Sequence, residues 1–220
     1  WNSAFLPSHR QLLTLVALLQ SPLLAIEGTI NAAASALDWL HAMHQREDNH
    51  GEDNHAEIAG LLNEEIAAPV FVNAVNGLGS PFWRSDIKPA FIETGSVSNS
   101  EFTPANYAAQ TVAVIESIVF ALAYNMELMK TSGTLARRIY VAGGLSQYNG
   151  LCQRLADITQ HPVTRHDDAE ASARGAAFWL AGCPKQWACD LPKTEFVPQK
   201  NLALQERYER WQKIMQEICK

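Results

Sequence analysis

Two adjacent glycines follow a short β-prone run in the second half of the chain, and this pair is the feature that could bind a ligand. Residues 139–142 read Ile-Tyr-Val-Ala, and Gly143 and Gly144 come directly after them. Glycines after a strand permit positive φ angles and let a flat or anionic ligand approach the backbone with no Cβ in the way. The pattern predicts a buried parallel strand and a turn, which either binds a nucleotide or only reverses the chain.

A helix is predicted directly after the turn, over residues 150–159. Leu151, Leu155 and Ile158 fall on one face of this helix. Its N-terminal amides and its dipole would then point toward a ligand held by the turn. Ligands of open α/β sheets bind at such strand-to-helix crossings, so the crossing is the predicted site.

The residues after the double glycine keep the order and spacing of a known signature. They are Asn149, Leu151, Gln153, Ala156-Asp157-Ile158, Pro162-Val163, Glu170 and residues 173–177, Ala-Arg-Gly-Ala-Ala. This order resembles the C-terminal signature of the FGGY carbohydrate kinases, the family of glycerol kinase and the pentulose kinases, and Glu27, Gly28 and Trp39 also match. The resemblance implies an α/β domain of the ribonuclease-H-like, actin-type ATPase fold, with a mixed sheet and flanking helices.

The resemblance also implies which residues contact ATP. In the family the double glycine lies against the adenosine, which assigns Gly143, Gly144 and Leu145 to the nucleotide site. Tyr148 stands where glycerol kinase has an asparagine that reads adenine. Tyr148 would stack on the base or fill the groove, and the neighbouring Asn149 would substitute for the lost amide.

A helix rich in small residues, predicted over residues 29–44, would complete the nucleotide site by the same resemblance. Ala34, Leu37 and Asp38 occupy the positions that face the nucleotide in glycerol kinase, which has glycine, isoleucine and glutamine there. The carboxylate of Asp38 near ATP costs electrostatic energy unless a cation or a hydrogen-bond donor accompanies it. The alternative is an ordinary core helix with Asp38 facing solvent.

Phosphoryl transfer needs a held nucleotide, a metal on the phosphates and a carboxylate that takes the hydroxyl proton. In the family this carboxylate is the aspartate of a Gly-Asp-Gln string, which precedes the matching segment together with a Thr-Gly-Thr phosphate turn. Neither string occurs here, so we assign no catalytic residue and no metal ligand. We interpret residues 1–220 as the C-terminal, nucleotide-side domain, which would use ATP and Mg²⁺ and work with an N-terminal domain of the same protein.

A loop rich in glycine indicates the substrate subclass. Residues 76–83 read Asn-Gly-Leu-Gly-Ser-Pro-Phe-Trp, which is closer to the Gly-Leu-Gly-Ala-Pro-Tyr-Trp of glycerol kinase than to the Gly-Glu-Arg of pentulose kinases. The resemblance thus implies phosphorylation of a sugar or polyol in the glycerol-kinase-like subclass. The alternatives are a pentulose kinase and a non-catalytic, nucleotide-binding regulatory member of the fold. The acceptor itself is not identified.

The remaining chain is interpreted by pattern. Residues 41–57 are rich in histidine and repeat Glu-Asp-Asn-His, and their spacing favours a solvated loop over a metal site. Strands are predicted over residues 66–75, 90–97 and 163–165, and helices over 104–130, 170–181 and 204–218. The helix over 104–130 carries apolar residues on nearly all sides, with Glu116 in its middle, and should be buried. The helix over 170–181 should pack tightly on the sheet through Gly175.

Composition bounds the class of protein. A chain of 220 residues that is 47% hydrophobic can form one domain with a substantial core. The net charge of −6 argues against nucleic acid and anionic membranes as main partners. Four cysteines without a CxxC pair fit reduced thiols, and no apolar run reaches the roughly 18 residues of a membrane helix. We therefore expect a cytoplasmic protein, and a homo-oligomer is compatible with the sequence.

Overall fold

The computed structural model describes residues 13–18, 22–44, 52–93, 96–97, 104–131, 136–167, 170–185, 187 and 191–220. The helices in this part are α1 (Ala34–Met43), α2 (Glu52–Leu61), α3 (Pro104–Thr131), α4 (Asn149–Thr159), α5 (Ala171–Leu180) and α6 (Leu202–Ile218). The strands are β1 (Leu13–Leu18), β2 (Pro22–Glu27), β3 (Val70–Val72), β4 (Ala90–Glu93), β5 (Ser96–Val97), β6 (Ile139–Val141), β7 (Val163–His166) and β8 (Lys193–Phe196).

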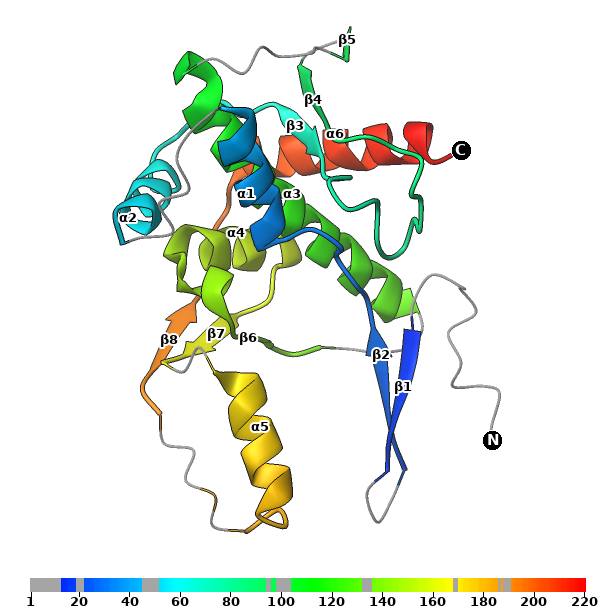
Figure 1. Cartoon of the computed structure of the whole chain (residues 1–220), viewed down its shortest axis with the longest axis vertical. Coiled ribbons are helices and arrows are strands. Elements are labelled where there is room, and N and C mark those ends of the chain that lie inside the picture. The colour runs from blue at the N-terminus through cyan, green and yellow to red at the C-terminus, as the bar shows by residue number, and fades with distance from the viewer. Residues whose placement is uncertain are drawn as a thin grey trace.

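The described strands form three small sheets around a central helix. β1 and β2 make an antiparallel hairpin, and β3, β4 and β5 make an antiparallel sheet. In the third sheet β6 pairs parallel with β7, and β8 pairs antiparallel with β7. The parallel pair is joined through α4, so β6, α4 and β7 form a βαβ unit. Figure 1 shows α3 between the sheet of β3, β4 and β5 and the sheet of β6, β7 and β8.

The helix α3 is the centre of the core, as the sequence predicts. Residues 110–120 are all buried, because α1, α2, α4 and β3 pack around this helix. Its segment Asn106–Thr131 is long and apolar enough to cross a membrane by length and composition alone, and 61% of an apolar 18-residue stretch within it is buried inside the fold. A core helix passes the same test, because both environments demand apolar residues on every side.

Two packing expectations are wrong. β6 is an edge strand of its sheet, and Tyr140 in its middle is 68% exposed, so the strand is not buried. Helix α5 does not pack tightly through Gly175, where an added Cβ would meet no described atom within 4 Å. None of its residues is buried, and it extends away from the sheet at the bottom of Figure 1.

Two predicted elements are shorter than expected. The predicted helix over residues 29–44 begins only at Ala34, because hydrogen bonds hold the preceding residues in a non-helical conformation. The backbone N–H of Ser80 donates to the Thr29 carbonyl at 2.8 Å, and Asn73 Nδ2 donates to the Ala32 carbonyl at 2.8 Å. Similarly, of residues 66–75 only β3 pairs as a strand.

The prediction that residues 41–57 form a solvated loop is wrong at both ends of this segment, which lie in α1 and α2. His41 is 4% exposed, with its Nε2 2.9 Å from Tyr107 Oη, and the second Glu-Asp-Asn-His repeat begins α2. The first repeat, with His50, lies outside the described residues. Within the described part, no group of three or more His, Cys, Asp or Glu side chains could hold a metal ion.

Candidate functional site

The double-glycine turn has the open backbone that a ligand needs. Gly143 adopts a φ of 91°, which favours glycine, and Gly144 begins a 3-10 helix that ends at Gln147. A Cβ built on either glycine would meet no described atom within 4 Å. The space beside this backbone is therefore free for a ligand, and the glycines are not explained by internal packing.

A buried arginine fixes the turn from the neighbouring strand. Arg165 of β7 is 9% exposed, and its Nη1 donates to the Ser146 carbonyl and to Asn149 Oδ1, each at 2.9 Å. The hydroxyl of Ser146 donates in turn to the Gly143 carbonyl at 2.7 Å. Because Arg165 holds the end of the turn and Ser146 ties that end back to Gly143, the shape of the turn is set before any ligand binds.

Tyr148 and Asn149 lie where the turn enters α4. Tyr148 is 7% exposed, and its ring stacks on His55 of α2 with centroids 4.3 Å apart and planes 13° apart. Burial raises the pKa of Tyr148, and the geometry favours the groove-filling interpretation over stacking on a base. Asn149 is exposed and uses its carbonyl oxygen on Arg165, which leaves its NH₂ group to donate to a ligand.

The predicted contacts on α1 are not joined to the turn. Ala34 and Asp38 are exposed, whereas Leu37 is 5% exposed and belongs to the hydrophobic core. No hydrogen bond links these three side chains to the turn within the part of the chain that the structure describes. The structure therefore brings together the predicted residues from Gly143 to Asn149 and leaves those of α1 on a separate element.

A hollow beside the turn adds residues that the sequence reasoning missed. It has a volume of about 240 Å³ and is lined by Tyr140, Val141, Ala142, His166, Ala171, Arg174 and Leu191. The exposed ring of Tyr140 stacks on His166 with centroids 6.0 Å apart. The hollow is smaller than the roughly 300–1,000 Å³ of a typical ligand pocket, so it suits one part of a nucleotide. The signal available in the sequence was the single aromatic residue in the strand before the glycines.

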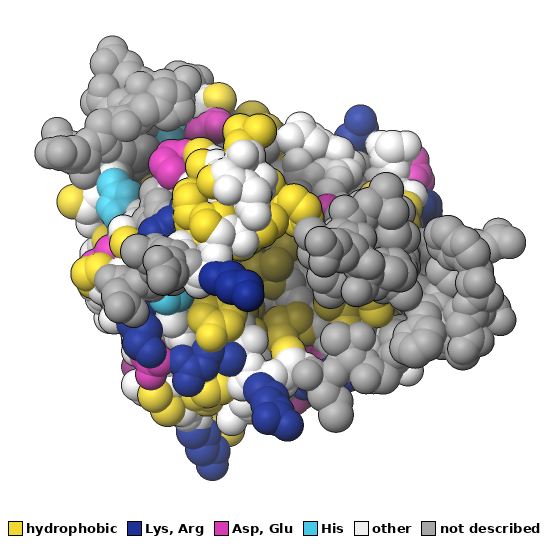
Figure 2. Space-filling view, turned by 90° about the horizontal axis from the view of Figure 1, so that it is seen from below, with side chains coloured by type: hydrophobic (Ala, Val, Ile, Leu, Met, Phe, Trp, Pro, Cys, Tyr) yellow, Lys and Arg dark blue, Asp and Glu magenta, His cyan; other side chains and the backbone are white. Residues whose placement is uncertain are grey.

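The face that carries α5 is suited to an anionic ligand with an apolar part. Figure 2, seen from below, shows a hollow with hydrophobic side chains on its floor and several Lys and Arg side chains around it. The N-terminus of α4 follows the turn directly, and its cap residue Tyr148 accepts no hydrogen bond through its side chain. The first amides of the helix therefore keep their capacity to bind an anion.

Comparison with known proteins identifies the family. Residues 6–181 match the model of the FGGY family of carbohydrate kinases, C-terminal domain. The chain is 30% identical over 207 residues to the glycerol kinase of Listeria monocytogenes serotype 4a, covering 87% of this chain and 38% of that protein. It is 31% identical over 181 residues to the glycerol kinase of Bacillus velezensis, covering 81% of this chain and 34% of that protein. The chain thus spans less than half the length of these relatives.

Solved structures share the fold. The xylulose kinase from Rhodospirillum rubrum superimposes with a TM-score of 0.72 at 20% identity, covering 98% of this chain and 44% of that one. The glycerol kinase of Plasmodium falciparum, solved with ADP, gives a TM-score of 0.71 at 20% identity and covers 94% of this chain and 42% of that one. The expected α/β fold of the ribonuclease-H-like, actin-type class is confirmed, and the chain belongs to the FGGY family of carbohydrate kinases, whose C-terminal domain it matches.

Proposed function

We propose that the chain is the nucleotide-side domain of an ATP-dependent carbohydrate or polyol kinase and that it binds the nucleotide at the Gly143–Gly144 turn. The observation that carries the proposal is the open backbone of this turn, held by Arg165 and followed by a helix N-terminus without a side-chain cap. A flat adenosine would lie against the two glycines, and Asn149 would donate to it.

The catalytic carboxylate would come from an N-terminal domain of the same protein. No aspartate of residues 1–220 lies in the Gly-Asp-Gln context of the family, so these residues alone would bind the nucleotide without transferring its phosphate. Mg²⁺ would arrive with the phosphates of ATP, because this ion keeps several waters and binds through one or two carboxylates together with phosphate oxygens. That arrangement does not require a cage of ligands within this chain.

The subclass we propose is glycerol-kinase-like. The glycine-rich loop of residues 76–83 supports it, and so do the named relatives at about 30% identity. The loop is a shaped structural element, because a Cβ at Gly79 would lie 2.2 Å from the Thr29 carbonyl oxygen. A pentulose kinase is the alternative within the same class.

A regulatory, non-catalytic nucleotide binder is the second candidate. The observation that favours it is the burial of Tyr148 under His55 at the position where glycerol kinase has its adenine-reading asparagine. Such a protein would bind ATP or ADP and would phosphorylate no acceptor.

Phosphate transfer by the full-length protein tests these proposals. ATP, Mg²⁺ and one of glycerol, xylulose, ribulose or gluconate are incubated with the protein, and ADP release is measured beside product formation. Transfer to glycerol supports the proposed subclass, and transfer to a pentulose supports the alternative. ATP binding without transfer to any acceptor favours the regulatory candidate, and the absence of both binding and transfer contradicts the proposal.

A further inference from the structure

A second and larger pocket lies apart from the double-glycine turn. Its volume is about 590 Å³, and it is formed by the segment that follows α2, one face of α4 and the beginning of α6. Gly143, Gly144 and Leu145 are not among its lining residues, and Asn149 is the one predicted site residue that borders it. The size is within the roughly 300–1,000 Å³ range of small-molecule sites.

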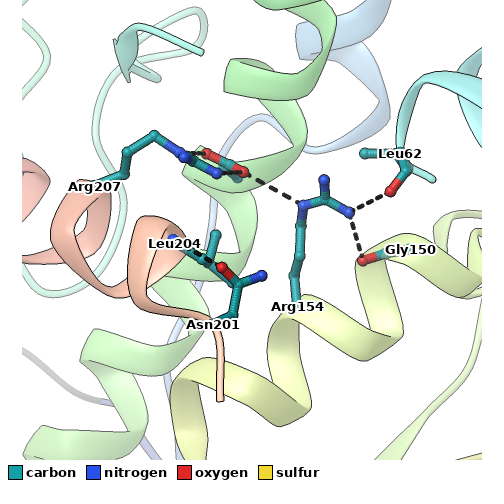
Figure 3. A network of polar contacts seen from close by, with 7 residues as sticks. Leu62, Gly150, Arg154, Asn201, Leu204 and Arg207 are labelled. Atoms are coloured by element: carbon teal, nitrogen blue, oxygen red, sulfur yellow. Dashed lines mark hydrogen bonds and ion pairs between the residues drawn. The ribbon is translucent and has the colours of Figure 1, made fainter. Parts of the chain in front are cut away.

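Two arginines with one shared carboxylate form part of the floor. Arg207 donates from Nε and Nη2 to the two oxygens of Glu116, each at 2.7 Å, and Arg154 donates from Nε to Glu116 Oε1 at 3.3 Å. Figure 3 shows the side chains of Arg154 and Arg207 extending toward one another from α4 and α6. The Glu116 side chain is 1% exposed, whereas those of Arg154 and Arg207 are 12% and 20% exposed. The arginines therefore retain N–H groups that can reach the pocket.

A buried carboxylate supplies the acceptor on the same floor. Asp157 is 8% exposed and lines the pocket. Its Oδ1 accepts from Gln153 Nε2 at 2.7 Å and from the backbone N–H of Gln199 at 2.8 Å. One oxygen of the carboxylate is thereby oriented by two donors, and its second oxygen keeps acceptor capacity for a ligand.

The wall between α4 and the segment after α2 is fixed by a close approach. A Cβ at Gly150 would lie 2.5 Å from Leu62 Cβ, so only glycine allows this contact. Across it, Arg154 Nη1 donates to the Leu62 carbonyl at 2.8 Å and to the Gly150 carbonyl at 3.2 Å. The pocket is therefore held open by paired backbone and guanidinium groups before a ligand arrives.

The two positive and two negative charges on the floor of the pocket balance, which favours a ligand without net charge. Glu116 neutralises one of the two guanidinium groups, and Asp157 opposes the remaining positive charge. Glu64 and Glu65 are exposed at the rim and would repel an anion. Each hydroxyl of a polyol both donates and accepts, so neighbouring hydroxyls can bridge the arginine donors and the aspartate acceptor without an added charge.

We propose that this pocket is a second ligand site, separate from the nucleotide site, which binds a neutral polyhydroxylated molecule such as a sugar or polyol. Arg154 and Arg207 donate to its hydroxyls and Asp157 accepts from them. The inference does not rest on kinase activity, because it concerns binding at residues outside the double-glycine turn.

NMR titration of the full chain tests the site without an activity assay. The backbone amides of Ala67 and Ala203 and the side-chain amide of Gln153 are the reporters, since all three residues line the pocket. D-glucitol and glycerol are the probes, and inorganic phosphate is the anionic counter-probe. We expect saturable shifts at these three reporters with at least one of the polyols and none with phosphate.

Two tryptophan substitutions at neighbouring positions, one inside the pocket and one outside it, give a matched comparison. Ala203→Trp places an indole in the pocket from an exposed position and should weaken polyol binding at least tenfold. Leu202→Trp, one residue earlier, 63% exposed and outside the lining, should leave the affinity unchanged. If Ala203→Trp does not fold, Gln153→Met takes its place, because it removes an amide at similar length and should also weaken binding.

Three results would overturn the proposal. One is the absence of saturable shifts with both polyols. A second is polyol binding that Ala203→Trp, or Gln153→Met in its place, leaves unaltered. The third is a pocket that responds to phosphate in preference to the polyols.

Discussion

The carboxylate of Glu116 gives the sharpest prediction about stability. It lies in the middle of the buried helix α3, is 1% exposed, and binds Arg154 of α4 and Arg207 of α6. Glu116→Gln keeps the shape of the side chain and removes its charge, so two largely buried guanidinium groups lose their counter-charge. Breaking a buried ion pair in this way costs about 3–5 kcal/mol. For a chain of this length each kcal/mol lowers Tm by about 2–4 °C, so a fall of roughly 6–20 °C is expected.

Urea unfolding followed by far-UV circular dichroism measures this free energy of unfolding. The matched control is Asp86→Asn, which breaks the exposed pair of Arg84 and Asp86, whose side chains are 34% and 64% exposed. Solvent screens such a pair, so the unfolding midpoint of the control should stay at the wild-type value. A Glu116→Gln variant with the wild-type midpoint would refute the reasoning that this triad joins α3, α4 and α6.

Three further predictions follow from contacts and pKa values. Gly79→Ala should lower the unfolding free energy by about 1–3 kcal/mol in urea, since its Cβ would lie 2.2 Å from the Thr29 carbonyl oxygen; an unchanged midpoint contradicts this. Burial raises the pKa of Cys152 to about 11, so mass spectrometry should find Cys152 unlabelled by iodoacetamide at pH 8 until the chain unfolds. The hydrogen bond from Arg84 lowers the pKa of Asp86 to about 2, so in an NMR titration Arg84→Gln should raise the pKa of Asp86 toward its ordinary value; an unchanged pKa contradicts this.

Much of the fold could be predicted because local patterns agree with it. The apolar helix over residues 104–130 is α3, and the strand–glycine–helix pattern around Gly143 is the βαβ unit of β6, α4 and β7. Periodicity could not reveal that β6 lies at an edge or that α5 extends away from the sheet. Both depend on which strands become neighbours, and that is set by contacts distant in sequence.

In the candidate site, too, the contacts that are local in sequence could be predicted, and those between distant segments could not. Gly143, Gly144 and Asn149 lie within one seven-residue stretch, so their proximity in space required no tertiary information. The stacking of His55 on Tyr148 joins α2 to α4 across a long sequence separation, and the histidine-rich composition around His55 suggested solvent instead. The burial of Leu37 could not be predicted either, because the pattern of a helix rich in small residues does not indicate which face packs against the core.

Equilibrium binding of ADP to a matched pair of glycine variants tests the central claim most directly. Gly144→Val and Gly60→Val each place a Cβ where no described atom lies within 4 Å, so the two substitutions start from equally open positions. Calorimetry should show ADP binding to the wild type and to Gly60→Val, and a loss of at least tenfold in affinity for Gly144→Val. Equal ADP affinity in all three proteins would contradict a nucleotide site at the double-glycine turn.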